Sequence, residues 1–133
     1  YQPHQGEKLV GISLLDAYTV AGKKRFIGNV TVSTDLVESN TLVGFENHSG
    51  LTYLQGSTTK IGDVIVGNGN NGRDKSEGAR YMNVFGTYMH GSFLPKNPQF
   101  ADYLIELATG KKPEPLDDRI ENMAHESLVG KKY

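Results

Sequence analysis

The sequence has no cysteine in any of its 133 residues. This absence excludes disulfide bonds, zinc–thiolate sites and a thiol nucleophile within these residues. It also fits the reducing environment of the cytoplasm, which is the location we predict. Any reaction that needs a cysteine must therefore obtain it from outside these residues.

The sequence also lacks an excess of charge and a long apolar run. Fourteen Lys and Arg residues stand against fifteen Asp and Glu residues, which leaves a net charge of −1. Binding to a phosphate backbone needs a clear basic excess, so we expect no nucleic acid as a partner. The apolar runs are far shorter than the roughly 20 residues of a membrane-spanning helix, and no secretory leader is visible.

Glycine-rich turns are frequent, and over residues 8–93 they separate short runs with the pattern of strands. The runs that we expect to form strands are Leu9–Leu15, Arg25–Ser33, Thr41–Phe45, Thr52–Gln55 and Val64–Val66, with a turn at Ala21–Lys24. Val84–Met89 is almost continuously apolar, which predicts a strand buried on both faces.

The last part of the chain has the features of two helices. Asn97 and Pro98 form a typical helix start, apolar residues follow at helical spacing, and Gly110 is a typical C-cap. We predict helices at about 97–109 and 116–129.

The order of these elements bears on the fold. A complete doubly wound domain alternates strands and helices, whereas here the strands come first and the helices last. We therefore predict an α/β fold in which residues 1–133 are the C-terminal part of a single domain. The first residues resemble the middle of a loop, which agrees with a longer parent chain.

His90 is a candidate for proton transfer. It follows the apolar run and precedes Gly91, which leaves space beside the ring. Ligands of open α/β sheets bind at the carboxyl ends of strands, and imidazole exchanges protons near neutral pH. The spacing leaves open whether His90 transfers a proton or only hydrogen-bonds a backbone carbonyl. Because no cysteine and no Gly-x-Ser-x-Gly elbow is present, a catalytic His90 needs a nucleophile from elsewhere.

A dense polar turn is predicted at Gly44–Gly50, directly after an apolar run. Its side chains, among them Glu46, Asn47 and Ser49, could bind the carboxylate and ammonium groups of an amino acid. The alternative is a solvated turn made of residues that favour turns.

No metal site is predicted. Asn68, Asn70 and Glu77 lack the leading aspartate and the spacing of a calcium loop, so we interpret Gly67–Gly72 as a flexible turn. Arg25, considered by itself, is interpreted as a solvated surface residue.

Five segments in this order resemble class I glutamine amidotransferases of the branch shared with cobyric acid synthase, and within it the GatD-type subunits. They are Gly11–Asp16, Arg25–Gly28, Gly44–Gly50, Gly67–Gly72 and Phe85–Gly91, the last followed by Leu94–Asn97. The resemblance implies the second half of a flavodoxin-like domain. It also implies a glutaminase whose cysteine attacks the side-chain amide of glutamine. That cysteine would lie on an elbow upstream of Tyr1, so these residues alone are expected to be inactive.

The resemblance also implies roles for single residues. His90 corresponds to the catalytic histidine. Glu46, Asn47 and Ser49 correspond to the turn that holds the main-chain groups of glutamine. Arg25 corresponds to a glutamine-binding arginine. What orients His90 is left open, because serine stands two residues after it, where many of these enzymes have a glutamate.

The implied partner is a MurT-like Mur ligase that uses the ammonia to amidate D-glutamate of lipid II in bacterial peptidoglycan synthesis. ATP and Mg²⁺ are expected in that ligase, and no cofactor is expected in this subunit. One alternative is a non-catalytic, amidotransferase-like interaction domain, against which the intact His90 argues. Another is a cobyric acid synthase-type glutaminase, which the Glu-Asn-His turn and the short helical tail disfavour.

Overall fold

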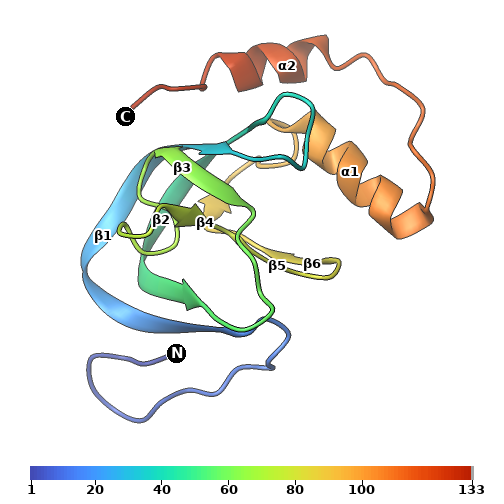
Figure 1. The fold of residues 1–133 in the computed structure, drawn as a ribbon. Coiled ribbons are helices and arrows are strands. Elements are labelled where there is room, and N and C mark those ends of the chain that lie inside the picture. The colour runs from blue at the N-terminus through green and yellow to red at the C-terminus, as the bar shows by residue number, and fades with distance from the viewer. Residues whose placement is uncertain (133) are drawn as a thin grey trace.

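A computed structural model describes residues 1–132, so that Tyr133 lies outside the described residues. Figure 1 shows the strands first along the chain and the helices last. The elements are β1 (Ala17–Ser33), β2 (Thr41–Leu54), β3 (Gly62–Val66), β4 (Ser76–Glu77), β5 (Ala79–Tyr81), β6 (Val84–Gly86), β7 (Met89–His90), α1 (Pro98–Thr109) and α2 (Arg119–Glu126).

One curled antiparallel sheet contains five of these strands, in the order β4-β3-β1-β2-β7, while β5 and β6 form a separate hairpin. The long strands β1 and β2 pair over most of their length and bend together (Figure 1). β7 lies at one edge of the sheet, where Met89 is opposite Glu46 and His90 is opposite Phe45. β4 lies at the other edge. His90 is thus carried by a short edge strand.

The hydrophobic core lies between the concave face of the sheet and α1. Its buried members are Val30, Val32, Val37, Leu42, Ile61, Met89 and Phe100. Phe100 brings α1 onto the sheet, and the ring centroids of Phe85 and Phe93 lie 5.7 and 5.5 Å from its own. Burial of this apolar surface is the main favourable contribution to folding of the piece.

The start of α1 is fixed by Asn97, which is only 2% exposed. The sequence suggested that Asn97 caps the helix, but its side chain makes no capping hydrogen bond. It binds the backbone of β2 and of the preceding loop instead. Oδ1 accepts a hydrogen bond from the Val43 amide at 2.8 Å, and Nδ2 donates to the carbonyls of Val43 and Phe93. The predicted helix start at Pro98 and the C-cap at Gly110, which has a φ of 71°, are confirmed.

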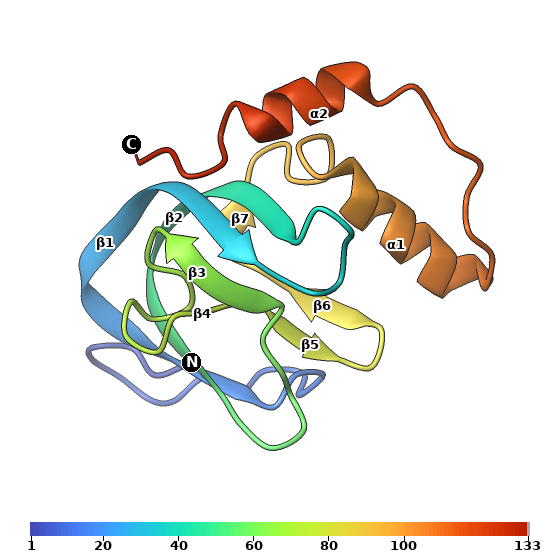
Figure 2. The same cartoon turned by 45° about the horizontal axis from the view of Figure 1, so that its top comes forward.

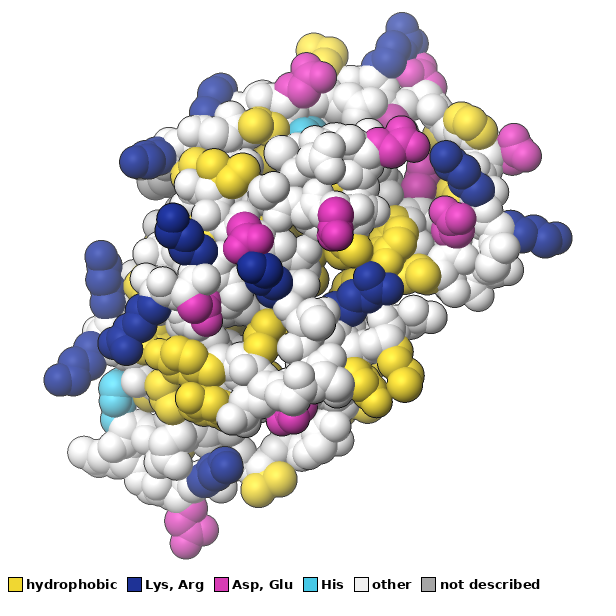
Figure 3. Space-filling view, in the orientation of Figure 1, with side chains coloured by type: hydrophobic (Ala, Val, Ile, Leu, Met, Phe, Trp, Pro, Cys, Tyr) yellow, Lys and Arg dark blue, Asp and Glu magenta, His cyan; other side chains and the backbone are white. Residues whose placement is uncertain are grey.

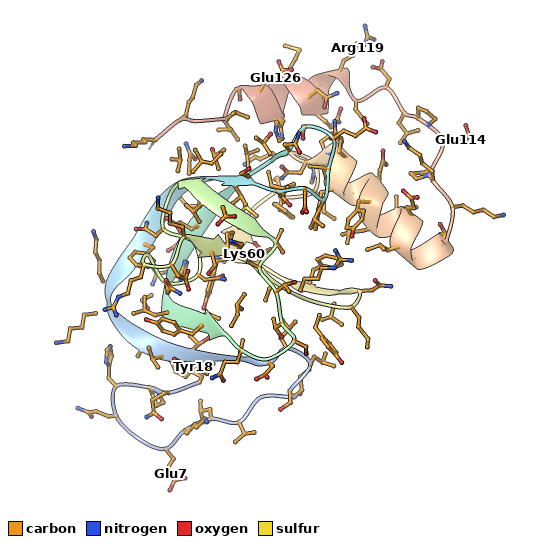
Figure 4. All side chains as sticks on the ribbon, viewed as in Figure 1. Glu7, Tyr18, Lys60, Glu114, Arg119 and Glu126 are labelled. Atoms are coloured by element: carbon orange, nitrogen blue, oxygen red, sulfur yellow. The ribbon has the colours of Figure 1, made fainter. Side chains whose placement is uncertain are left out.

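The second helix, α2, is shorter than predicted. It is attached through His125, whose Nδ1 donates to the carbonyl of Lys96 at 2.8 Å and whose Nε2 lies 2.9 Å from the Thr41 hydroxyl. Its apolar residues Ile120 and Met123 are 78% and 69% exposed, so polar anchoring rather than apolar packing holds it. Figure 2 shows α2 beyond the end of the sheet where β1 finishes and β2 begins. Arg119 and Glu126 extend away from the sheet (Figure 4).

Two predictions for the first part of the chain are wrong. Leu9–Leu15 is not a strand; it lies in an irregular, exposed segment that includes Glu7 at its outer turn (Figure 4). Its apolar residues are largely in solvent, for example Ile12, which is 86% exposed. The predicted turn at Ala21–Lys24 lies inside β1, where the register shifts between Ala21 and Phe26 while pairing with β2 continues on both sides. The additional residues bulge out of the ladder instead of reversing the chain.

Two predictions for β2 and β7 also need correction. Thr41–Phe45 and Thr52–Gln55 are not separate strands, and Gly44–Gly50 is not a turn, because β2 runs continuously through both regions. Val84–Met89 is not one buried strand. It divides into β6, which pairs with β5, and the first residue of β7, which pairs with β2. By contrast, the strand predicted at Val64–Val66 is confirmed within β3.

Neither α1 nor α2, the helices of residues 1–132, is long and apolar enough to cross a membrane. Figure 3 shows basic and acidic side chains interspersed over one face of the molecule, together with several exposed apolar patches.

Candidate functional site

The two faces of β2 carry different chemistry. Side chains of directly opposed residues in an antiparallel pair lie on the same face, and successive residues alternate. One face therefore presents Ile27, Asn29, Phe45, Asn47 and His90, and we call it the outer face. The opposite face presents Phe26, Gly28, Glu46, His48 and Met89, and we call it the inner face. Predicted site residues occur on both.

On the outer face, Arg25 and Asn47 are joined directly. The Arg25 Nε donates a hydrogen bond to Asn47 Oδ1 at 2.6 Å, and both side chains are exposed. The register shift in β1 brings Arg25 there, since Gly22–Arg25 lie opposite Ser49 alone. Ser49 is half-buried. Within residues 1–132 the guanidinium has donors to spare beside an exposed amide, a combination that suits a carboxylate.

His90 shares this face with Asn47 and is itself exposed. The strand ends directly after it because Gly91 and Ser92 both have positive φ, 54° and 55°. For Ser92 this is a conformation that L-residues rarely adopt. The imidazole is thus presented at the sheet edge, open to a group that approaches from outside the described residues.

On the inner face, Glu46 is 1% exposed, and its carboxylate accepts hydrogen bonds from the loop that follows β3. Its Oε1 accepts hydrogen bonds from the Asn68 amide at 2.9 Å and from the Asn68 side chain at 2.6 Å, and its Oε2 accepts from the Gly69 amide at 3.0 Å. Burial by itself would raise the pKa of the Glu46 carboxyl. The nearby His48 imidazole and these donors outweigh burial and hold that pKa below its usual value.

His48 links Glu46 to the segment that leads into β7. Its Nδ1 donates to the Gly50 carbonyl at 2.9 Å, which turns Nε2 toward Glu46 Oε2 at 3.7 Å. Its ring stacks on the ring of Tyr88 with a centroid distance of 3.6 Å and an angle of 3°. The Tyr88 hydroxyl lies 2.8 Å from the Thr52 hydroxyl. The polar inner face is therefore packed into the interior.

Glu77 on β4 is the most deeply buried carboxylate, with no exposed surface. Its Oε1 accepts hydrogen bonds from the Thr87 hydroxyl at 2.5 Å and from the Tyr88 amide at 3.0 Å. Burial raises the pKa of Glu77, and the two hydrogen bonds only partly oppose it. These bonds hold Thr87 and Tyr88, the two residues between β6 and β7.

The loop at Gly67–Gly72 is pinned by two buried asparagines. Asn70 Nδ2 donates to the carbonyl of Gly78 at 2.8 Å, and Asn71 Nδ2 donates to the carbonyl of Thr52 at 2.9 Å. Both side chains are 2% exposed. The positive φ expected of its glycines is present, for example 65° at Gly69, but the loop is tied to its neighbours on several sides.

The structure thus places His90, Asn47 and Arg25 on the outer face, with a direct contact between Arg25 and Asn47, and places Glu46 on the inner face. The roles predicted for Arg25, Glu46, Asn47, Ser49 and His90 stay predictions. Sequence reasoning missed His48, Tyr88 and Glu77 as a connected set. The alternation of Glu46, Asn47 and His48 along one strand was the available signal, but it was interpreted as a turn. Residues 1–132 contain no group of three or more His, Asp or Glu side chains arranged to hold a metal ion.

We predict that Glu46→Gln lowers the free energy of unfolding at pH 7 by about 1–3 kcal/mol, because a neutral amide accepts hydrogen bonds from the loop more weakly than a carboxylate. The folded-state pKa of Glu46 lies below its unfolded value. Its contribution is therefore complete above the unfolded pKa of about 4.3 and is lost as the pH falls through the folded pKa. Urea unfolding at pH 7 and at lower pH measures both effects.

The matched control is Glu38→Gln, which changes a carboxylate whose side chain is 90% exposed. It should leave stability nearly unchanged at both pH values. An equal loss for Glu46→Gln at neutral and acid pH would contradict an ionised, hydrogen-bonded Glu46.

Comparison with known proteins identifies the family. Residues 2–98 match the model of the CobB/CobQ-like glutamine amidotransferase domain. The chain is 40% identical to lipid II isoglutaminyl synthase (glutamine-hydrolyzing) subunit GatD of Staphylococcus aureus, over 97% of this chain and 54% of that protein. It is 37% identical to the subunit of the same name from Streptococcus pneumoniae, over 84% of this chain and 43% of that protein.

A more distant relative is a probable cobyric acid synthase of Methanococcus maripaludis. The identity is 32%, over 77% of this chain and 21% of that protein. The chain spans about half the length of the two GatD relatives. Since the family match includes β1 to β7 and reaches the start of α1, this chain belongs to the CobB/CobQ-like glutamine amidotransferase domain family.

Proposed function

We propose that this chain is the histidine-bearing part of a GatD-type glutaminase, which hydrolyses L-glutamine to glutamate and supplies ammonia to a MurT-like ligase. That ligase would amidate D-glutamate of lipid II in bacterial peptidoglycan synthesis. The observation that carries the proposal is the exposed imidazole of His90 on the same sheet face as the Arg25–Asn47 pair. The similarity to two GatD subunits over most of the chain supports it.

The proposed reaction divides its work between His90 and a cysteine supplied by the rest of the intact protein. His90 accepts the thiol proton, and the thiolate attacks the side-chain amide carbon of glutamine. His90 then returns the proton to the departing ammonia. Water attacks the thioester, which releases glutamate and restores the thiol. The exposure of the ring is what permits such an approach.

The substrate's amino-acid end would lie along the outer face. We propose that the Arg25 guanidinium binds the glutamine carboxylate and that Asn47 and Ser49 bind its main-chain groups. The 2.6 Å bond between Arg25 and Asn47 supports this by aligning the two side chains. Glu46 would contribute from the inner face, by holding the loop at Asn68 and Gly69.

The intact domain would complete the flavodoxin-like fold with residues upstream of those described here. An open apolar groove supports this part of the proposal. It has a volume of about 410 Å³ and is lined by residues of the N-terminal segment, of β6 and of the β6–β7 connection, among them Leu14, Leu15, Val84 and Tyr88. Exposed apolar side chains beside it, such as Leu14 at 55%, would be buried by packing of the missing half.

The remaining expectations about the whole protein stay predictions. They are the ATP and Mg²⁺ of the ligase, the lack of a cofactor in this subunit and the cytoplasmic location. The GatD assignment is preferred to a cobyric acid synthase-type glutaminase because the identity to the GatD subunits is higher and covers more of both chains.

We expect His90→Ala to reduce ammonia release from glutamine by the intact protein about 10³-fold or more, because proton transfer to and from the cysteine is lost. A coupled glutamate or ammonia assay with the partner ligase present measures this. Glu114→Ala, which changes an exposed residue in the linker between α1 and α2, is the control and should keep wild-type turnover. Turnover of the His90 variant within a few-fold of wild type would remove His90 from the reaction.

Arg25→Ala should raise the KM for glutamine about tenfold or more and lower kcat much less, because a charge-assisted hydrogen bond to the substrate is worth about 1.5–3 kcal/mol. Steady-state kinetics over a range of glutamine concentrations separate the two constants. Lys24→Ala removes the adjacent positive charge in the same bulge and is the matched control. If both variants keep the wild-type KM, Arg25 is a solvated surface residue.

A further inference from the structure

We propose that Glu77 is a positioning residue for His90, which it serves by holding the two residues that lead into β7. This inference rests on the proposed function for the role of His90. Glu77 itself lies on β4 and does not touch the outer face. Its effect would pass through Thr87 and Tyr88 to the strand that carries the imidazole.

A continuous set of hydrogen bonds connects Glu77 to β7. Glu77 Oε1 accepts from the Thr87 hydroxyl at 2.5 Å and from the Tyr88 amide at 3.0 Å. The Thr87 hydroxyl oxygen in turn accepts from the Met89 amide at 2.9 Å. Met89 is the residue directly before His90. The carboxylate therefore fixes the backbone at consecutive residues up to the neighbour of the proposed catalytic histidine.

β7 is short, so its pairing with β2 is limited. β7 has two residues and pairs with β2 only at Phe45 and Glu46. Two-residue pairing at a sheet edge supplies little stability by itself. Met89 is pressed against Gly44, where an added Cβ would lie 2.5 Å from the Met89 Cβ. That contact holds β7 against β2, and the hydrogen bonds of Glu77 hold Thr87 and Tyr88, the two residues before β7.

The same bonds close the curled sheet. β4 and β7 are its two edge strands, and Glu77 reaches from one edge to the residues that enter the other. His48 supports the connection from the inner face, since its ring stacks on Tyr88 at 3.6 Å. The Tyr88 ring and the Tyr88 amide are thus held by two different strands, β2 and β4.

The burial of Glu77 indicates that stability alone does not explain why a carboxylate occupies this position. Its side chain has no exposed surface, and its Oε2 has no hydrogen-bond partner among residues 1–132. A buried, partly satisfied carboxyl group is costly, and an apolar residue often serves stability better. What the carboxylate provides is a single oxygen that accepts from a hydroxyl and an amide at once, and this sets the geometry of residues 87 and 88.

The test uses the intact protein with its partner ligase. Thr87→Val removes the hydroxyl with little change in shape at an exposed side chain, and Thr109→Val on α1 is its matched control. Glu77→Ala removes the acceptor, whereas Glu77→Gln keeps an oxygen at the same place. We expect Thr87→Val and Glu77→Ala to lower kcat about tenfold or more with the KM for glutamine within about twofold, since misplacement affects proton transfer more than binding. Glu77→Gln should recover most of kcat.

The pH profile of cysteine alkylation by iodoacetamide separates positioning from a general loss of stability. A thiol paired with His90 reacts at lower pH than a free thiol, whose pKa is about 8.5. In Thr87→Val the alkylation midpoint should move toward the free-thiol value, whereas loss of folded protein lowers the amplitude without moving the midpoint. Thr109→Val should keep the wild-type profile.

Wild-type kcat and an unshifted alkylation profile in Thr87→Val would overturn the inference, as would equal losses in Glu77→Gln and Glu77→Ala. If the wild-type protein releases no ammonia, the proposed function fails, and amide hydrogen exchange decides the inference separately. Exchange at Tyr88 and Met89 at least about tenfold faster in Thr87→Val than in Thr109→Val would show that the segment is held as described. Unchanged exchange would show that it is not. If Glu77→Ala does not fold, Thr87→Val carries the test.

Discussion

The closure of the curled sheet by Glu77 is the constraint on which the rest of the structure depends. The five-stranded sheet has β4 at one edge and β7 at the other, and the Glu77 carboxylate joins them through Thr87 and Tyr88. The other contacts of β7 are its two residue pairs with β2 and the packing of Met89 in the core. The link binds Thr87 and Tyr88, where the apolar run that looks like one strand is divided into β6 and β7. The chain must leave the β5–β6 hairpin and cross to β2, and the carboxylate binds it at the crossing.

The two faces of β2 carry two kinds of polar residue, buried and exposed. On the inner face, Glu46 and His48 are buried. Glu46 accepts a hydrogen bond from Asn68, and the His48 ring stacks on Tyr88. On the outer face, Asn47 and His90 are exposed, and Arg25 joins them through a bulge in β1. One strand therefore supplies both the internal polar network and an exposed polar surface. This division follows from the two-residue period of a strand, which turns neighbouring polar residues to opposite sides.

The sequence predicted some of this and missed the rest for physical reasons. The ends of α1 were predictable because proline and glycine act locally, and the alternation in β1 was visible because the buried side is apolar. His90 was predicted as a candidate because a titratable residue stands after an apolar run. The continuity of β2 was not predictable in this way, because Glu46 and His48 are buried only by virtue of partners more than twenty residues away. Glu77 was also not predictable, because its partners lie at least ten residues later in the chain, in the segment that enters the opposite edge of the sheet. The polar residues of Gly44–Gly50 indicated a turn, but contacts with residues distant in the sequence place them in a strand.

The most direct test of the account is a structure of the intact protein with a glutamine analogue bound covalently to its cysteine. The account predicts that the His90 imidazole lies within hydrogen-bond reach of the modified sulfur, about 3–4 Å, and that Arg25 and Asn47 contact the amino-acid end of the adduct. A structure in which the His90 ring lies more than about 8 Å from the sulfur, beyond the reach of direct or water-mediated proton transfer, would contradict it.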